Sequence, residues 1–179
     1  MHDAHLHLQD PRLSNNLPSL IAEMQASGIT HAVVNGTSPD DWPQVQKLAE
    51  TYPNFITPSY GLHPWKTPTT DPDWKQKLTQ LLDQNPKACI GECGLDRWIK
   101  DPNIPAQQEA FHFQLDLATQ RNLPISIHIL KAWGLLTETL KNHPTPERGF
   151  LLHSFGGSTE TAHQLLDHGA YFSLSGYFL

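Results

Sequence analysis

The chain has few cysteines, and their positions limit the disulfide chemistry that is possible. Only Cys89 and Cys93 carry a thiol among 179 residues. On one strand, four residues at about 3.3 Å each would separate them by about 13 Å, which exceeds the reach of a disulfide. We therefore predict free thiols in a reducing compartment.

Several other features are missing, and each excludes a class of protein. No apolar run is long enough to span a bilayer, and the opening residues are polar and rich in histidine, unlike a signal peptide. We expect a cytoplasmic protein without membrane contact. The formal net charge of −6 argues against a protein that coats nucleic acid through a generally basic surface. A local phosphate-binding site is still compatible with this charge. No Gly-x-Gly-x-x-Gly follows the first predicted strand, so a Rossmann dinucleotide site has no support.

Strand-like and helix-like segments alternate along the chain. Strands are predicted at residues 2–8, 30–35, 55–60, 88–92, 124–129, 150–153 and 171–174. Between them apolar residues recur at helical spacing, as at Leu17, Leu20 and Met24. Ser38 and Pro39 have the N-cap and N1 order of a helix start. This alternation with short connections predicts an α/β fold with a parallel sheet.

Polar residues fall at the C-terminal ends of several predicted strands. This placement favours a TIM-type (β/α) barrel over a doubly wound sheet, because barrel active sites are built from strand ends. No linker, repeat or low-complexity tract divides the chain, so we predict one domain over residues 1–179. A full barrel has about 250 residues. We therefore expect that the last strand–helix unit is missing and that the chain is truncated at its C-terminus.

Eleven histidines are a high count for this length and invite a search for a metal site. His5 and His7 have i, i+2 spacing on the first predicted strand, so both rings would point to one face, opposite Leu6 and Leu8. Two neutral imidazoles on one face can together coordinate a divalent metal ion. Asp3 shares that face and could orient one of the rings. An ordinary polar N-terminus is the competing interpretation.

His128 lies in a strongly β-branched predicted strand. If Ile125, Ile127 and Ile129 face the helices, then Ser126 and His128 face the barrel axis. A single histidine in such a run is more often a hydrogen-bonded core residue than a metal ligand. His128 therefore supports a metal site only together with polar residues at the ends of other strands.

Other polar residues take equivalent places on other strands. Glu92 ends a buried strand, where a carboxylate is costly unless it is paired or bound to a cation. His63 follows one further predicted strand, and His153 ends another. For His63, a polar residue in a Gly-His-Pro turn is the competing interpretation. Several such residues at matching strand ends indicate one shared site.

Five motifs carry a family resemblance. They are Asp3-Ala4-His5-Leu6-His7-Leu8, Gly61-Leu62-His63-Pro64, Ile90-Gly91-Glu92-Cys93-Gly94-Leu95-Asp96, Leu123-Pro124-Ile125-Ser126-Ile127-His128 and Leu152-His153-Ser154-Phe155-Gly156-Gly157. In this order, and over most of the chain, the sequence resembles the TatD family of metal-dependent hydrolases, which have amidohydrolase-type barrels.

The resemblance implies a site for two divalent metal ions. It implies that His5 and His7 bind one ion and that His128 and His153 bind the other. The Glu92 carboxylate would bridge the two ions. Glu92 is also implied as the catalytic carboxylate, and His63 as a substrate-binding residue or proton shuttle at the rim. The expected ions are zinc, manganese or magnesium, and histidine-rich sites suit magnesium least.

Two departures from the family pattern bear on function. Leu130 stands where family members commonly have an arginine, and on a continuous strand Lys131 would point to the opposite face. The last family ligand, an aspartate on an eighth strand, has no counterpart, and Asp167 at a predicted helix end is not a suitable substitute. Apolar residues 176–179 close the chain, and the first and seventh strands are expected to have unpaired edges.

Three functions follow from these observations. The resemblance implies a TatD-like deoxyribonuclease that hydrolyses phosphodiesters with metal-activated water. The acidic balance and the missing arginine favour an alternative, a small-molecule amidohydrolase or esterase with the same metal site. The third hypothesis is a non-catalytic, incomplete barrel. The expected partner is accordingly DNA or a small molecule, and the oligomeric state is left open.

Overall fold

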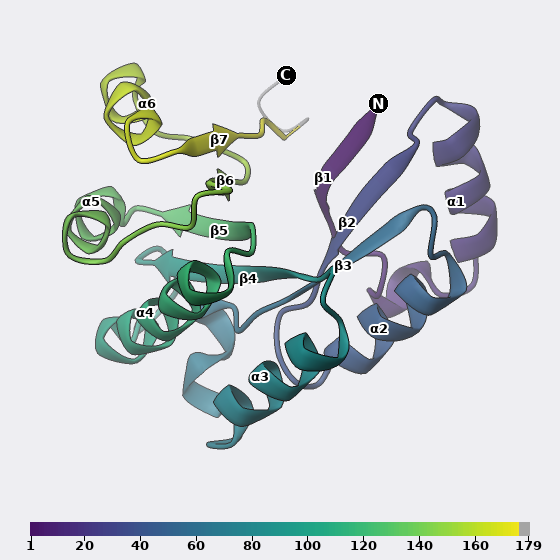
Figure 1. Ribbon diagram of the computed structural model, residues 1–179, viewed down its shortest axis with the longest axis horizontal. Helices are drawn as coiled ribbons and strands as arrows, with labels where there is room; N and C mark the ends of the chain where they lie inside the picture. Colours follow the sequence, from purple (N-terminus) through teal and green to yellow (C-terminus); the bar gives the residue numbers. More distant parts are fainter. Residues whose placement is uncertain (176–179) are drawn as a thin grey trace.

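The computed structural model describes residues 1–175, in which seven strands alternate with helices (Figure 1). The strands are β1 (His2–Leu6), β2 (His31–Asn35), β3 (Ile56–Tyr60), β4 (Cys89–Asp96), β5 (Ile125–Leu130), β6 (Phe150–Leu152) and β7 (Ala170–Phe172). The α-helices are α1 (Leu17–Ala26), α2 (Trp42–Thr51), α3 (Trp74–Gln84), α4 (Ile104–Arg121), α5 (Trp133–Asn142) and α6 (Thr159–Leu166). Two short 3-10 helices, η1 (Pro11–Leu13) and η2 (Pro64–Thr69), follow β1 and β3.

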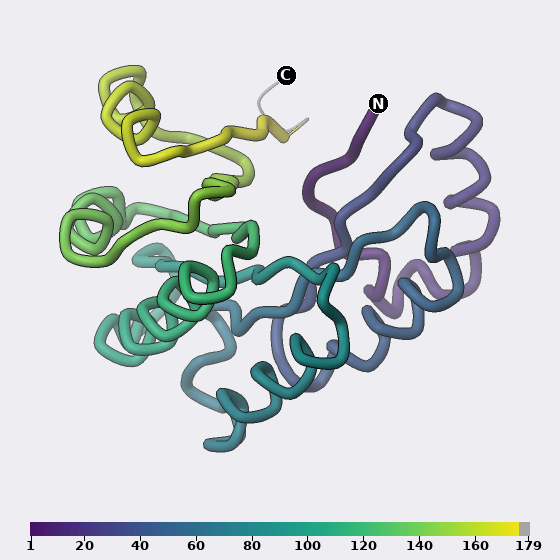
Figure 2. Tube along the Cα trace, in the orientation of Figure 1, coloured from purple at the N-terminus to yellow at the C-terminus, as the bar shows by residue number. Residues whose placement is uncertain are grey.

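The strands form one parallel sheet in the order β1 to β7. The sheet curls and the helices lie outside it, as Figures 1 and 2 show. Within the described residues, β1 pairs only with β2 and β7 only with β6. The predicted α/β barrel architecture and its two open edges are therefore confirmed. The apolar end at residues 176–179 lies outside the described residues.

The core lies between the sheet and its helices. Ile125, Ile127 and Ile129 of β5 are all buried in this layer, which confirms the predicted isoleucine face. Cys89 and Cys93 both lie on β4 as free thiols. Among residues 1–175, the helices are all too short or too polar to cross a membrane.

Glycine allows β4 to approach β5 closely around the predicted site. Gly94 pairs with His128 and has a φ of +138°, and a Cβ there would lie 2.0 Å from the His128 carbonyl oxygen. Gly91 has a φ of +133°, and its Cβ would lie 2.6 Å from the carbonyl oxygen of Ser126. Both backbone conformations are strained for any residue with a side chain. The two glycines therefore bring Glu92, between them, against β5.

The start of α2 differs from the prediction. The helix begins at Trp42 with Asp41 as N-cap, and not at Ser38. The Asp41 carboxylate accepts hydrogen bonds from the Thr37 backbone N–H and hydroxyl, both at 2.8 Å, and so closes a loop before the helix. Trp42 is buried, and its indole N–H donates to the Gly61 carbonyl at 3.0 Å. This tertiary contact fixes the helix start and has no local signal.

We predict that Gly94→Ala lowers the free energy of unfolding by about 1–3 kcal/mol, because it combines a disfavoured backbone conformation with a clash at β5. Urea unfolding measures the change. Gly134→Ala, in α5, is the matched control: a Cβ there has open space, so stability should stay constant or rise slightly. Equal stability of the two variants would show that the strands do not need glycine at 94.

Candidate metal centre

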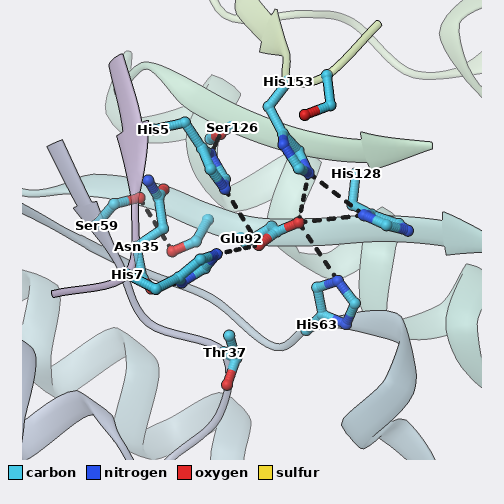
Figure 3. A network of polar contacts seen from close by, with 12 residues as sticks. His5, His7, Asn35, Thr37, Ser59, His63, Glu92, Ser126, His128 and His153 are labelled. Atoms are coloured by element: carbon cyan, nitrogen blue, oxygen red, sulfur yellow. Dashed lines mark hydrogen bonds and ion pairs between the residues drawn. The ribbon is translucent and has the colours of Figure 1, made fainter. Parts of the chain in front are cut away.

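Glu92 is the centre of a cluster of five histidines (Figure 3). Its side chain is only 3% exposed, and its backbone N–H donates to the Gly36 carbonyl at 2.9 Å. The nearest ring nitrogens are His5 Nε2 and His7 Nε2, 3.3 and 3.1 Å from Oε2, and His63 Nε2, His128 Nδ1 and His153 Nε2, 3.3, 3.2 and 2.7 Å from Oε1. The structure thus brings together every residue that the sequence singled out for the site.

The Glu92 carboxylate remains ionised in this setting. Its burial opposes ionisation, but hydrogen bonds from the histidines outweigh burial and hold the pKa of the carboxyl well below its usual range. Its two oxygens face two different groups of histidines. An anion of this kind is suited to hold cations on both sides.

The neutral form of His7 would present the lone pair of Nε2 to Glu92. Its Nδ1 lies 2.7 Å from the Asn35 carbonyl oxygen, which can only accept, so Nδ1 carries the proton. Nε2 in the neutral ring is then an acceptor that points toward Glu92. Burial lowers the pKa of His7, but the contacts with Glu92 and Asn35 raise it above its ordinary value. A metal at this place would therefore displace a proton from the ring.

His5 provides the clearest sign of a missing partner. Its Nδ1 lies 2.8 Å from the Ser126 hydroxyl, while its Nε2 is buried without a hydrogen bond. Burial lowers its pKa to about 4 despite the nearby Glu92, so the ring is neutral at pH 7. Its ring stacks on that of His153 at 3.9 Å between centroids. A buried, neutral, unpartnered ring nitrogen beside a carboxylate fits a metal ligand.

His128 is oriented by a residue to which the sequence analysis assigned no role. Asp96 is buried at the end of β4, and its Oδ2 lies 3.0 Å from His128 Nε2. The carboxylate accepts from Nε2, so in the neutral ring the lone pair lies on Nδ1, which faces Glu92. Burial lowers the pKa of His128, but the contacts with Glu92 and Asp96 raise it above its ordinary value. Burial opposes ionisation of Asp96, yet hydrogen bonds from Trp65, the Trp98 backbone and His128 lower its pKa. Carboxylates that orient ligand histidines in this way are common in metal sites.

The strand period could have revealed Asp96. Residues 92, 94 and 96 share one face of a strand, so Asp96 follows Glu92 on the side of the site. Asp3, by contrast, does not orient a ring as expected. Its Oδ1 accepts the His5 backbone N–H at 3.2 Å, and the Ser126 hydroxyl and the Asn35 carbonyl take the ring contacts instead.

His63 differs from the other histidines in its proton position. Its Nδ1 accepts the Trp65 backbone N–H at 3.2 Å, so the neutral ring carries its proton on Nε2, toward Glu92. Burial lowers its pKa and favours this neutral form. Because a protonated Nε2 has no lone pair for a metal, the geometry favours hydrogen-bond donation at this position.

Distances alone allow two metal positions. The donor atoms of His5, His7 and Glu92 lie within 4.8 Å of one another, as do those of His63, Glu92 and His128. His153 Nε2 lies 3.3 Å from His128 Nδ1, beside the second position. Given the proton on His63 Nε2, His153 is the better ligand on that side.

Glu92 and four histidines of the cluster line a cavity of about 880 Å³: His7, His63, His128 and His153. Trp65 and two cationic side chains, Arg12 and Lys66, belong to its lining within residues 1–175. Leu130 and Lys131 do not, and Lys131 Nζ lies instead 5.0 Å from the centre of the Trp98 ring. The cationic side chains of the lining therefore come from elements other than β5, and Asp10 and Asp41 lie beside them in the lining.

Comparison with known proteins places the chain in a family. A family profile described as TatD related DNase matches residues 2–179. A protein of Edwardsiella piscicida named 3'-5' ssDNA/RNA exonuclease TatD is 29% identical over 99% of this chain and 68% of its own length. The uncharacterized metal-dependent hydrolase YjjV of Escherichia coli K12 is 29% identical over 93% of this chain and 64% of its own length.

Solved structures agree with this placement. The crystal structure of YjjV, a TatD homologue from Escherichia coli K12, matches with a TM-score of 0.89 and 29% identity, over 96% of this chain and 66% of that one. A TatD family hydrolase from Entamoeba histolytica, 19% identical, shares the fold with a TM-score of 0.83 over 97% of this chain and 64% of that one. This chain spans about two thirds of the length of these relatives.

The curled parallel sheet, with a histidine–carboxylate cluster at the C-terminal ends of its strands, defines a barrel-type metal-dependent hydrolase. More specifically, the chain belongs to the TatD related DNase family. The predicted family and its metal dependence are confirmed. The number and identity of the ions remain predictions.

We predict that Asp96→Asn weakens metal affinity about 10- to 100-fold. The carboxylate accepts N–H groups on both oxygens, from Trp65 and His128 on Oδ2 and from Trp98 on Oδ1, so an amide NH₂ would meet a donor on either side. Competition with a chromogenic chelator measures the affinity for Zn²⁺.

Asp116→Asn is the matched control for this variant. Asp116 also contacts a histidine, with Oδ1 2.9 Å from His143 Nδ1, but this pair lies outside the cluster. We expect wild-type affinity. Equal affinities of the Asp96 and Asp116 variants would show that Asp96 does not position His128 for the metal.

Proposed function

We propose that this chain is a divalent-metal-dependent phosphodiesterase that removes nucleotides from the end of single-stranded nucleic acid. The observation that carries the proposal is the ionised Glu92 carboxylate, whose two oxygens face two groups of histidine ring nitrogens that can bind a metal when the rings are neutral. Support for the substrate comes from relatives named 3'-5' ssDNA/RNA exonuclease TatD.

Two metal positions follow from the donor atoms. His5, His7 and Glu92 would hold one ion, and Glu92, His128 and His153 the other. When bound, a pair of divalent ions supplies an activated water and stabilises negative charge on a phosphoryl oxygen. The many imidazole donors favour zinc or manganese over magnesium.

The remaining residues act on the substrate. We assign to His63 the donation of a hydrogen bond from Nε2 to a phosphate oxygen in the cavity. Lys66 in the lining supplies positive charge that the absent arginine at Leu130 would otherwise give, whereas Arg12 is paired with Asp10. Asp96 holds His128 in one orientation and does not contact the substrate.

The alternatives formulated from the sequence receive less support. One of the relatives named above specifies single-stranded nucleic acid, and the other leaves the substrate open. A non-catalytic barrel is disfavoured because the ligand cluster is assembled and lies in an open cavity.

We predict that His7→Ala and Glu92→Gln reduce hydrolysis of a single-stranded oligonucleotide to the level of protein treated with chelator, because each removes a ligand. Release of a 3'-terminal labelled nucleotide measures the rate, and added Zn²⁺ or Mn²⁺ should restore only the chelated wild type. His143→Ala, a histidine outside the cluster, should keep full activity. Undiminished hydrolysis by the His7 variant in the presence of chelator would overturn the metal-dependent mechanism.

A further inference from the structure

Trp65 is an exposed indole on the wall of the catalytic cavity. It lies in η2 directly after His63 and Pro64, and 57% of its surface is exposed. It lines the same cavity as Glu92 and His128. A single exposed apolar side chain is ordinary on a protein surface. A large one inside the mouth of a polar site needs a reason.

The indole is held in one orientation by the site itself. Its Nε1–H donates to Asp96 Oδ2 at 2.6 Å, and Asp96 is fully buried. Its ring stands nearly perpendicular to that of His63, at 85° and 5.1 Å between centroids, and at 73° and 6.2 Å to that of His128. A preorganised aromatic surface loses little entropy when a ligand packs on it.

A cation accompanies this aromatic surface. Lys66 follows Trp65 in η2 and lines the cavity, and it forms no ion pair with a carboxylate among residues 1–175. Arg12, which also lines the cavity, is engaged by Asp10 through both carboxylate oxygens. Lys66 is therefore the more available partner for a phosphate. An aromatic face next to a free cation is the combination that binds a base and its phosphate in single strands.

We propose that Trp65 is a stacking platform for the base of the terminal nucleotide, with Lys66 on a neighbouring phosphate. This inference rests on the proposed function and extends it to a base-binding subsite. Stacking on the indole requires an unpaired base, so the subsite selects single-stranded ends over blunt duplex ends. It tolerates all bases, because each has an aromatic face.

Binding in the presence of EDTA tests the platform without hydrolysis. The probes are two otherwise identical labelled oligonucleotides, one with a normal 3'-terminal nucleotide and one with an abasic terminus. Trp65→Ala should raise the Kd of the normal oligonucleotide by roughly 5- to 150-fold, the range for loss of one base–aromatic stack. It should barely change the Kd of the abasic one. Trp65→Phe should retain most of the affinity for the normal end.

Several results would overturn the platform. An equal loss on both oligonucleotides, or a Trp65→Phe variant as weak as Trp65→Ala, would show that Trp65 acts through its hydrogen bond to Asp96 and not by stacking. Trp98→Ala is the control: Trp98 is 65% exposed but does not line the cavity, so its loss should leave both Kd values unchanged. An equal loss from Trp98→Ala would also contradict the platform.

Failure of the proposed function has a different signature. If the metal-loaded wild type releases no nucleotide while Trp65→Ala still weakens binding of the base-terminated oligonucleotide alone, the phosphodiesterase proposal falls and the base-binding subsite stands. If hydrolysis occurs but the two oligonucleotides bind the variant and wild type alike, only the subsite falls.

Discussion

The burial of one ionised carboxylate among five imidazoles is the constraint on which this structure depends. Removing a carboxylate from water costs several kcal/mol unless opposite charge or strong hydrogen bonds compensate. Glu92 receives this compensation only if β1, β3, β5 and β6 all deliver a histidine at or just beyond their C-terminal ends. The parallel order of the strands and the close approach of β4 to β5 at Gly94 serve that condition. The arrangement of strands that defines the fold is therefore the same arrangement that assembles the metal centre.

Much of this arrangement could be predicted from the spacing at which apolar and polar residues recur along the sequence. The alternation of strands and helices gave the parallel barrel, and the buried face of Ile125 and Ile127 placed His128 on the opposite side. The i, i+2 spacing of His5 and His7 predicted convergence, although β1 ends at Leu6 and His7 lies just beyond it. These predictions succeed because a two-residue period is a local property of the backbone.

The parts that sequence analysis missed depend on contacts between distant segments. Which group orients each ring is such a case: Asp3 is only two residues from His5, but Ser126, on another strand, takes the ring contact. Asp96 is similar: the strand period places it on the side of the site, but its contacts with His128 and Trp65 are not local. The start of α2 depends on Trp42 reaching Gly61. No local pattern encodes these pairings.

The most direct test of the metal centre is an anomalous difference map from crystals grown with Zn²⁺ or Mn²⁺. We expect density beside the Glu92 carboxylate, with one ion bound by Nε2 of His5 and of His7 and a second bound by Nδ1 of His128. Occupied metal sites elsewhere on the protein, with none at Glu92 and a carboxylate still hydrogen-bonded to the surrounding histidines, would contradict the assignment of this cluster as a metal centre.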